Sequence, residues 1–191
     1  MFTGIITNIG KVSKNENKIL TLKVSKDFLA KVEKGVSISV NGICLTIIDK
    51  TKDYFKVDFM PETEEKTNIR NLKINDLVNL EFPVTPSSLL SGHILQGHID
   101  EISKILDIKL SGNSKILKLS ISNSLAKYIV EKGSIAINGI SLTVIKMEKD
   151  SFTIGIIPYT WNNTMLKQIK IGDFLNIEVD ILAKYVEKLL K

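Results

Sequence analysis

Two polar side chains occupy the same place in two nearly identical stretches of the sequence. Cys44 and Ser141 each follow an Asn-Gly-Ile triplet and precede a Leu-Thr pair, within 41–46 and 138–143. Neither residue lies in a nucleophile-elbow motif or belongs to a recognisable series of triad partners. We therefore expect the thiol and the hydroxyl to bind or polarise a ligand rather than to attack it. The alternative is that each is only a small residue in a tight turn.

The titratable candidates differ between the two stretches. His98 takes the position that Ile5 has earlier in the chain, and Asp180 falls where the earlier part has Pro83. One repeat thus has a titratable group where the other has none, although an ordinary exposed histidine would give the same pattern. His93 and His98 are five residues apart and would point to different sides of a strand or a helix. We therefore predict no shared metal ion.

These positions belong to a tandem repeat. Residues 41–81 and 138–178 align without a gap at an offset of 97, with 17 identical residues in 41 pairs. Residues 3–6 match 96–99 more weakly but in the same order. A period of this length is typical of two similar small domains rather than of a solenoid. Prolines, serines and a glycine between 83 and 95 indicate the boundary.

Each repeat is composed mainly of short strands. Residues 19–24 and 116–121 alternate polar and apolar side chains, as half-buried strands do. The Asn-Gly pair inside 38–48 indicates a turn or a bulge that folds the strand back. The other expected strands are 55–59, 77–82, 152–156 and 174–179, with short helices over 27–33 and 123–131 and after Pro61 and Pro158. About six short strands per repeat predict an all-β fold of two antiparallel barrels.

The end of the chain departs from the repeat. Residues 181–190 place apolar side chains at helical spacing, and an amphipathic helix outside two finished barrels needs a partner. Self-association is the natural candidate. We predict three segments: a barrel over 1–92, a second barrel over 93–180 and an association helix over 181–191.

Composition narrows the class of protein. Lysine and arginine total 26 against 21 acidic residues, a net charge of +5, but Arg70 is the only arginine. Nucleic-acid recognition favours arginine, so we expect no nucleic-acid partner; a small-barrel binder of single strands is the alternative of this kind. The single cysteine excludes an intrachain disulfide and a cysteine-cluster metal site. The sequence has neither a basic signal peptide nor a long apolar span, so we expect a cytoplasmic protein without a membrane partner.

Six motifs, in register over the whole chain, resemble those of the riboflavin synthase (alpha chain) family. They are 1–6, 41–46, 60–63, 92–98, 138–143 and 157–160. The resemblance implies two six-stranded Greek-key barrels and a C-terminal helix that assembles a homotrimer. It also implies the last step of riboflavin biosynthesis, without cofactor or metal. In that step one 6,7-dimethyl-8-ribityllumazine gives a four-carbon unit to a second, yielding riboflavin and 5-amino-6-(ribitylamino)uracil.

The resemblance also implies two pockets that meet between the N-terminal barrel of one subunit and the C-terminal barrel of the next. By position, the first pocket would use Phe2, Thr3, Gly4, Ile5, Ile6, Cys44, Leu45, Thr46, Asp58, Phe59, Met60, Pro61, Glu62 and Thr63. The second would use Gly97, His98, Ile99, Lys132, Ser141, Leu142, Thr143, Gly155, Ile156, Ile157, Pro158, Tyr159 and Thr160. The candidates for proton transfer and for stabilising the adduct are His98, Ser141, Cys44 and Asp180.

One departure and one rival remain at this point. The family usually has Arg-Ala where this chain has Phe82-Pro83, which leaves the relative orientation of the barrels open. A non-catalytic lumazine-binding fluorescent protein would share the barrels. The polar candidates retained in both repeats favour the enzyme.

Overall fold

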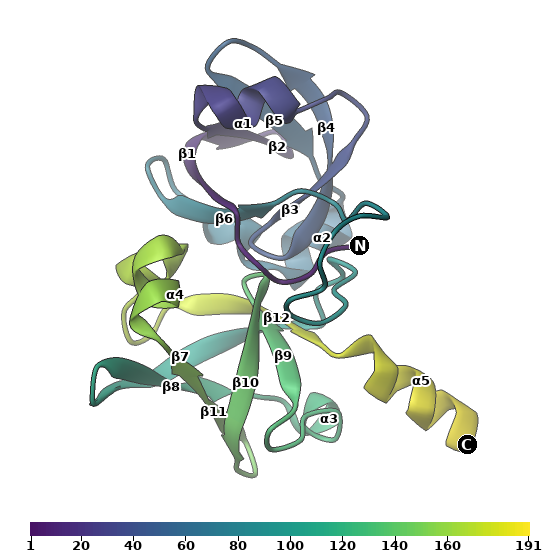
Figure 1. Ribbon diagram of the computed structural model, residues 1–191, viewed down its shortest axis with the longest axis vertical. Helices are drawn as coiled ribbons and strands as arrows, with labels where there is room; N and C mark the ends of the chain where they lie inside the picture. The colour runs from purple at the N-terminus through teal and green to yellow at the C-terminus, as the bar shows by residue number, and fades with distance from the viewer.

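The computed structural model describes all residues 1–191 and contains two closed six-stranded barrels (Figure 1). The first barrel consists of β1 (Asn8–Glu16), β2 (Ile19–Lys23), β3 (Ser37–Val40), β4 (Ile43–Lys50), β5 (Tyr54–Asp58) and β6 (Leu77–Glu81). The second consists of β7 (Glu101–Ser111), β8 (Ser114–Ser120), β9 (Ser134–Ile137), β10 (Ile140–Met147), β11 (Ser151–Ile156) and β12 (Phe174–Val179). The spatial order β1-β2-β5-β4-β3-β6 recurs in the second barrel, and every strand pair is antiparallel. The predicted pair of barrels is confirmed.

Each barrel encloses its own hydrophobic core. Seventeen buried apolar residues fill the first barrel and another seventeen fill the second. Alternation along the strands supplies them: in β4, Ile43, Leu45 and Ile47 are buried while Thr46 is exposed. The alternate positions therefore face away from the core, and there a ligand can reach them.

Short helices and 3-10 turns connect the strands. They are α1 (Lys26–Lys31), α2 (Pro61–Lys66), η1 (Asn68–Asn71), α3 (Asn123–Ala126), α4 (Pro158–Asn163), η2 (Met165–Gln168) and α5 (Ile181–Leu190). Pro61 and Pro158 occupy the first turns of α2 and α4, as expected. The helix predicted over 123–131 is shorter, because the chain turns inward after Ala126 and buries Ile129 in the second core.

The Asn-Gly pairs form two-residue hairpin turns. Asn41 and Gly42 have φ of 48° and 81°, and Asn138 and Gly139 have φ of 46° and 76°. Positive φ at both turn residues matches the twist of the flanking strands and explains the Asn-Gly choice. The turn expected at Asn41-Gly42 is confirmed.

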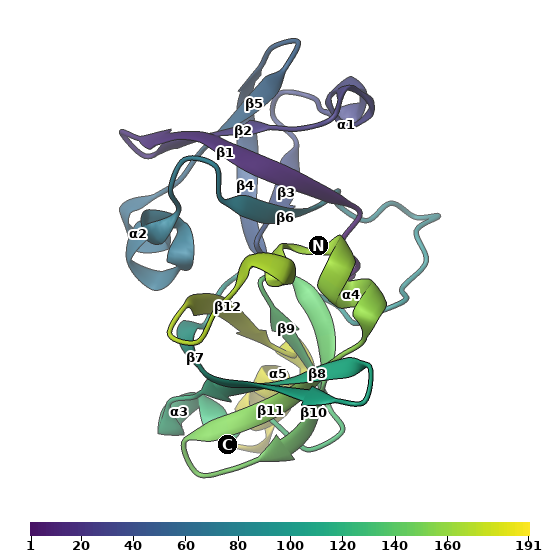
Figure 2. The same ribbon diagram turned by 90° about the vertical axis from the view of Figure 1, so that its left-hand side faces the viewer.

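The tips of these two hairpins meet and join the barrels around a local two-fold axis. A Cβ added to Gly42 would lie 2.7 Å from the Gly139 backbone nitrogen, and one added to Gly139 would lie equally close to that of Gly42. Buried asparagines reinforce this contact. The side-chain amide of Asn79 donates to the backbone carbonyl of Asn138, and that of Asn176 donates to the backbone carbonyl of Asn41, both at 2.9 Å. Figure 2 shows the resulting stack of one barrel on the other.

The segments that lead into the two barrels are exchanged. Ile6, which precedes β1, packs against the core of the second barrel, whereas Ile99, which precedes β7, packs against that of the first. Phe2 and Leu95 pair as a short antiparallel bridge between the two segments. The ranges 1–92 and 93–180 as domain limits stay a prediction, since each barrel is completed by a residue of the other range.

The last helix, α5, extends from the second barrel (Figure 1). Its polar side is tied to that barrel: Glu187 pairs with Lys127 at 2.6 Å and accepts from the Tyr128 hydroxyl, and Lys184 pairs with Asp100. Leu182 and Leu189 on the other side are 61% and 83% exposed. No helix in the chain has the length and apolar character needed to cross a membrane.

Candidate active site

Cys44 and Ser141 occupy equivalent places on the outside of the two barrels. Each is the second residue of the strand that follows a hairpin turn, and each is half-buried. Thr46 and Thr143, two residues further along, are exposed on the same outward face. Leu45 points into the first core, so this predicted contact is limited to its backbone.

The structure brings these two residues to the exchanged segments. The Cys44 amide donates to the Gly97 carbonyl at 2.9 Å, and the Ser141 amide donates to the Gly4 carbonyl at 2.8 Å. The sequence grouped Gly4 with Cys44 and Gly97 with Ser141, and the structure pairs them the other way round. The reason is the crossing of residues 1–6 and 96–99, which a match between repeats cannot reveal.

Two buried carboxylates fix these segments. Glu81 accepts from the Thr3 amide at 2.7 Å, the Thr3 hydroxyl at 2.6 Å and the Gly4 amide at 3.0 Å. Glu178 accepts from the Gln96 amide at 2.6 Å and the Gly97 amide at 3.0 Å. Each carboxylate thus holds the leading segment of its own repeat against the hairpin of the other.

Burial raises the pKa of both carboxyls. The pKa of Glu178 is raised to about 7, because desolvation of the charged form outweighs the two amide hydrogen bonds. Burial also raises the pKa of Glu81, and the Thr3 hydroxyl opposes that shift. Glu178 has no such hydroxyl because Gln96 stands where the first repeat has Thr3.

The proton-transfer candidates are in different surroundings. The Ser141 hydroxyl lies 2.7 Å from Nδ1 of His93, whereas the Cys44 thiol makes no hydrogen bond. Asp180 caps α5, where its carboxylate accepts from the Leu182 amide at 3.0 Å. The side chain of His98 is exposed.

His93 was not among the residues that the sequence assigned to the site. Its contact with Ser141 spans 48 positions of the chain, so no local pattern brings the two residues together. The one available signal was its place beside Gly92 in one of the six motifs.

Most of the remaining predicted residues lie where β5 and β11 lead into α2 and α4, whereas Lys132 precedes β9. Phe59 and Ile156 are buried in the two cores, so their side chains face away from any outer site. Met60, Ile157 and Tyr159 are exposed apolar side chains, and Lys132 is exposed at a positive φ of 66°. Exposed apolar side chains such as these suit a surface that a second molecule covers.

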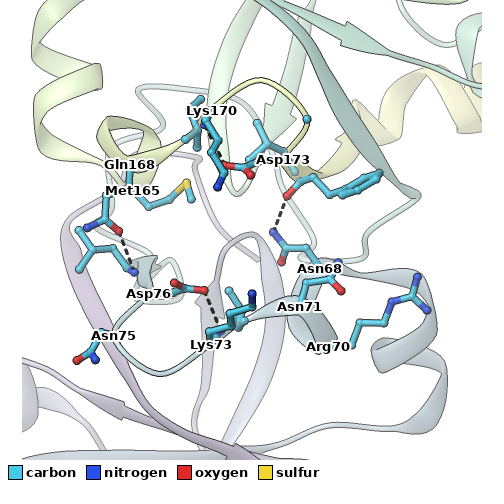
Figure 3. A pocket seen from close by; sticks show the side chains of 16 residues that line it. Asn68, Arg70, Asn71, Lys73, Asn75, Asp76, Met165, Gln168, Lys170 and Asp173 are labelled. Atoms are coloured by element: carbon cyan, nitrogen blue, oxygen red, sulfur yellow. Dashed lines mark hydrogen bonds between the residues drawn. The ribbon is translucent and has the colours of Figure 1, made fainter.

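A separate groove of about 970 Å³ lies between the barrels (Figure 3). It is bordered by η1 and η2, and Lys73, Asp76, Lys170 and Asp173 line it together with neighbouring residues of 68–77 and 165–175. None of the predicted site residues lines this groove. Its position near the two-fold axis follows from the way the barrels pack.

Comparison with known proteins agrees with this geometry. The family model described as "Lumazine binding domain" matches the chain twice, over residues 3–83 and 96–180. Riboflavin synthase of Actinobacillus pleuropneumoniae is 41% identical over 194 residues, which cover 100% of this chain and 90% of the relative. The chain belongs to the riboflavin synthase family. The resemblance drawn from the six motifs is thereby confirmed.

Other relatives support the same assignment. Riboflavin synthase of Bacillus subtilis is 40% identical and covers the whole of this chain. Among solved structures, that of LumP with riboflavin has a TM-score of 0.87, 27% identity and coverage of 94% of this chain and 99% of LumP. LumP with 6,7-dimethyl-8-(1'-D-ribityl) lumazine has a TM-score of 0.84. This riboflavin synthase family member therefore shares its barrels with an enzyme family and with a ligand-binding protein.

Proposed function

We propose that this family member catalyses the dismutation of two 6,7-dimethyl-8-ribityllumazine molecules to riboflavin and 5-amino-6-(ribitylamino)uracil. The observation that carries the proposal is the pair of equivalent outer sites around Cys44 and Ser141, in a chain that matches riboflavin synthases along its full length. A reaction between two copies of one substrate requires two similar sites. The duplicated hairpins and exchanged segments supply them.

The sites are completed by a second chain. Thr46 and Thr143 face outward, and Met60 and Ile157 are exposed apolar residues of the same two barrels. When the first barrel of one chain covers the second barrel of another, two lumazines lie face to face and water is excluded. Holding both reactants in register lowers the entropic cost of their encounter.

The assembly is a homotrimer joined through α5. One side of this helix is tied to its own barrel through Glu187 and Lys184, while Leu182, Tyr185, Val186 and Leu189 remain exposed. An apolar stripe of this kind gains free energy when it is covered by copies of itself.

The chemistry of this chain's residues is proton transfer and stabilisation of charge. The C7 methyl group of the lumazine is acidic, so a base or a well-placed hydroxyl can remove its proton. Ser141, Cys44, His98 and Asp180 are the residues that we assign to this role and to stabilising the adduct. No cofactor or metal ion takes part.

The test is to incubate the purified protein with the lumazine and to follow riboflavin by its absorbance. We expect turnover without added metal or nucleotide, and equal turnover in EDTA. Activity that requires a divalent ion would contradict the cofactor-free mechanism. Bound lumazine without riboflavin formation would favour the second candidate function, that of a binding protein. This candidate rests on the structural similarity to LumP, whose structures hold riboflavin and the lumazine.

A further inference from the structure

The mechanism above gives no role to His93, a buried side chain in contact with Ser141. Its exposed fraction is 8%, and its Nδ1 lies 2.7 Å from the Ser141 hydroxyl oxygen. That distance is typical of a good hydrogen bond to a hydroxyl. His93 thus contacts Ser141, the only hydroxyl side chain among the residues assigned to proton transfer.

The surrounding backbone holds the imidazole in place. The His93 amide donates to the Thr3 carbonyl at 3.2 Å, and the Phe2–Leu95 bridge follows directly. At Gly92, an added Cβ would lie 2.1 Å from the Thr3 carbonyl oxygen and 2.8 Å from Cβ of Ser141. The segment before His93 is therefore packed against the serine itself, which limits the positions that the ring can take.

The imidazole is suited to orienting a hydroxyl rather than to carrying charge. Burial lowers the pKa of His93, and the Asp180 carboxylate only partly opposes this. A neutral imidazole has one N–H and one free lone pair, so Nδ1 either donates to the hydroxyl or accepts from it. Nε2 is buried without a partner, so the bond to Ser141 is the only hydrogen bond of the ring.

The equivalent position in the first barrel lacks this arrangement. The Cys44 thiol has no hydrogen-bond partner, although its backbone is bound to Gly97 just as Ser141 is bound to Gly4. The two sites are therefore alike in backbone and different in side-chain chemistry. An oriented hydroxyl is present on one side only.

We propose that His93 is a positioning residue that fixes the Ser141 hydroxyl toward the reacting atoms of the lumazine bound beside it. This inference rests on the proposed function. A free serine hydroxyl rotates among several directions, and a buried acceptor or donor selects one of them. His93 thus gives the second-barrel site an oriented hydroxyl, which the Cys44 site lacks.

Two substitutions of His93 separate orientation from packing. His93→Leu keeps a side chain of similar bulk but removes the hydrogen bond, and we expect single-turnover rates to fall roughly tenfold. The Kd of the lumazine should change less than threefold, because the ligand contacts remain. His93→Asn places an amide near the position of Nδ1, and most of the rate should be retained.

Double substitutions supply the matched control. In a Ser141→Ala background, His93→Leu should lower the single-turnover rate little, since the hydroxyl that His93 orients is already gone. In a Cys44→Ala background, the same substitution should lower the single-turnover rate by the same factor as in the wild type. Equal losses in both backgrounds would overturn the proposal, as would wild-type turnover of His93→Leu.

Three further outcomes also test the role of His93. If His93→Leu does not fold, the comparison passes to His93→Asn and His93→Gln, where only the shorter amide mimics Nδ1; equal rates for the two would overturn the proposal. If the wild-type chain makes no riboflavin, the proposed function fails and this inference fails with it. If the wild type is active and His93→Leu is unaffected, the inference alone fails.

Discussion

At the scale of single residues, Cys44 and Ser141 show how a duplicated chain gives equivalent positions different surroundings. Their backbone amides donate to equivalent carbonyls, those of Gly97 and Gly4, at 2.9 and 2.8 Å. Only Ser141 adds a side-chain partner, His93. A hydroxyl and a thiol also differ in hydrogen-bond strength and acidity, so exchange of the two residues should not be neutral.

We predict that Ser141→Ala lowers turnover more than it lowers lumazine affinity. Loss of one hydrogen bond to a developing charge corresponds to roughly 1.5–3 kcal/mol, or about ten- to hundredfold in rate. Cys44→Ser should be milder than Cys44→Ala. Single-turnover kinetics on folded protein, with binding measured separately, would check this. Wild-type turnover of Ser141→Ala would make the serine structural and leave the polar chemistry to His98 and Asp180.

At the scale of elements, the two exchanged segments depend on buried carboxylates. Glu81 and Glu178 are each 4% exposed, and each accepts backbone amides of the segment before its own barrel. Without these bonds, buried amides would have no partner, which is costly. The segments that carry Gly4 and Gly97 to the opposite hairpins are thus ordered by single side chains.

We predict that Glu178 makes the free energy of unfolding fall as pH rises. Its pKa is about 7 in the folded chain against an ordinary value of 4.5. A raised pKa favours the protonated folded form, so this contribution is fully present below pH 4.5 and is lost as pH rises through 7. A shift of this size corresponds to about 3 kcal/mol. Denaturant unfolding at pH 5 and pH 8, at one protein concentration, would measure the change.

The control for this prediction is the equivalent carboxylate. Glu178→Gln should flatten the pH dependence, because glutamine does not titrate. Glu81→Gln should flatten it less, since the Thr3 hydroxyl opposes the upward shift there. Parallel pH profiles for the wild type and Glu178→Gln would contradict the assignment.

At the scale of the whole molecule, α5 lies outside the two closed barrels with one apolar side uncovered. Glu187 holds the helix to the second barrel, and Lys127, Lys191 and the Tyr128 hydroxyl lower its pKa to about 2. The orientation of the helix is therefore set by its own chain, while Leu182 and Leu189 remain exposed. A helix fixed in this way presents its apolar stripe ready for a partner.

We predict that deletion of residues 181–191 converts a trimer into monomers. The shortened chain should still bind the lumazine, because both barrels keep their cores, but it should react poorly, because each complete site needs two chains. Light scattering would measure the mass, and riboflavin formation the activity. A trimer that persists after the deletion would show that the barrels themselves hold the assembly.

The sequence by itself determined the repeat, the barrels and the family. Alternating side chains specify strands, and positive φ at both turn residues calls for Asn-Gly, so the hairpins at Asn41 and Asn138 are local properties of the chain. Cys44, Ser141 and their neighbours could be selected because the repeat places them after these turns. Such features depend on residues close together in sequence.

Only the tertiary structure decided which residues meet. The exchange of segments that brings Gly4 to Ser141 and Gly97 to Cys44 links positions far apart in the chain, and the bond between His93 and Ser141 spans 48 residues. A repeat alignment relates equivalent positions within each barrel and carries no information about crossing between them. Two hairpin tips that pack around a local two-fold axis leave each leading segment nearer to the opposite barrel, and this packing determined which residues meet Cys44 and Ser141.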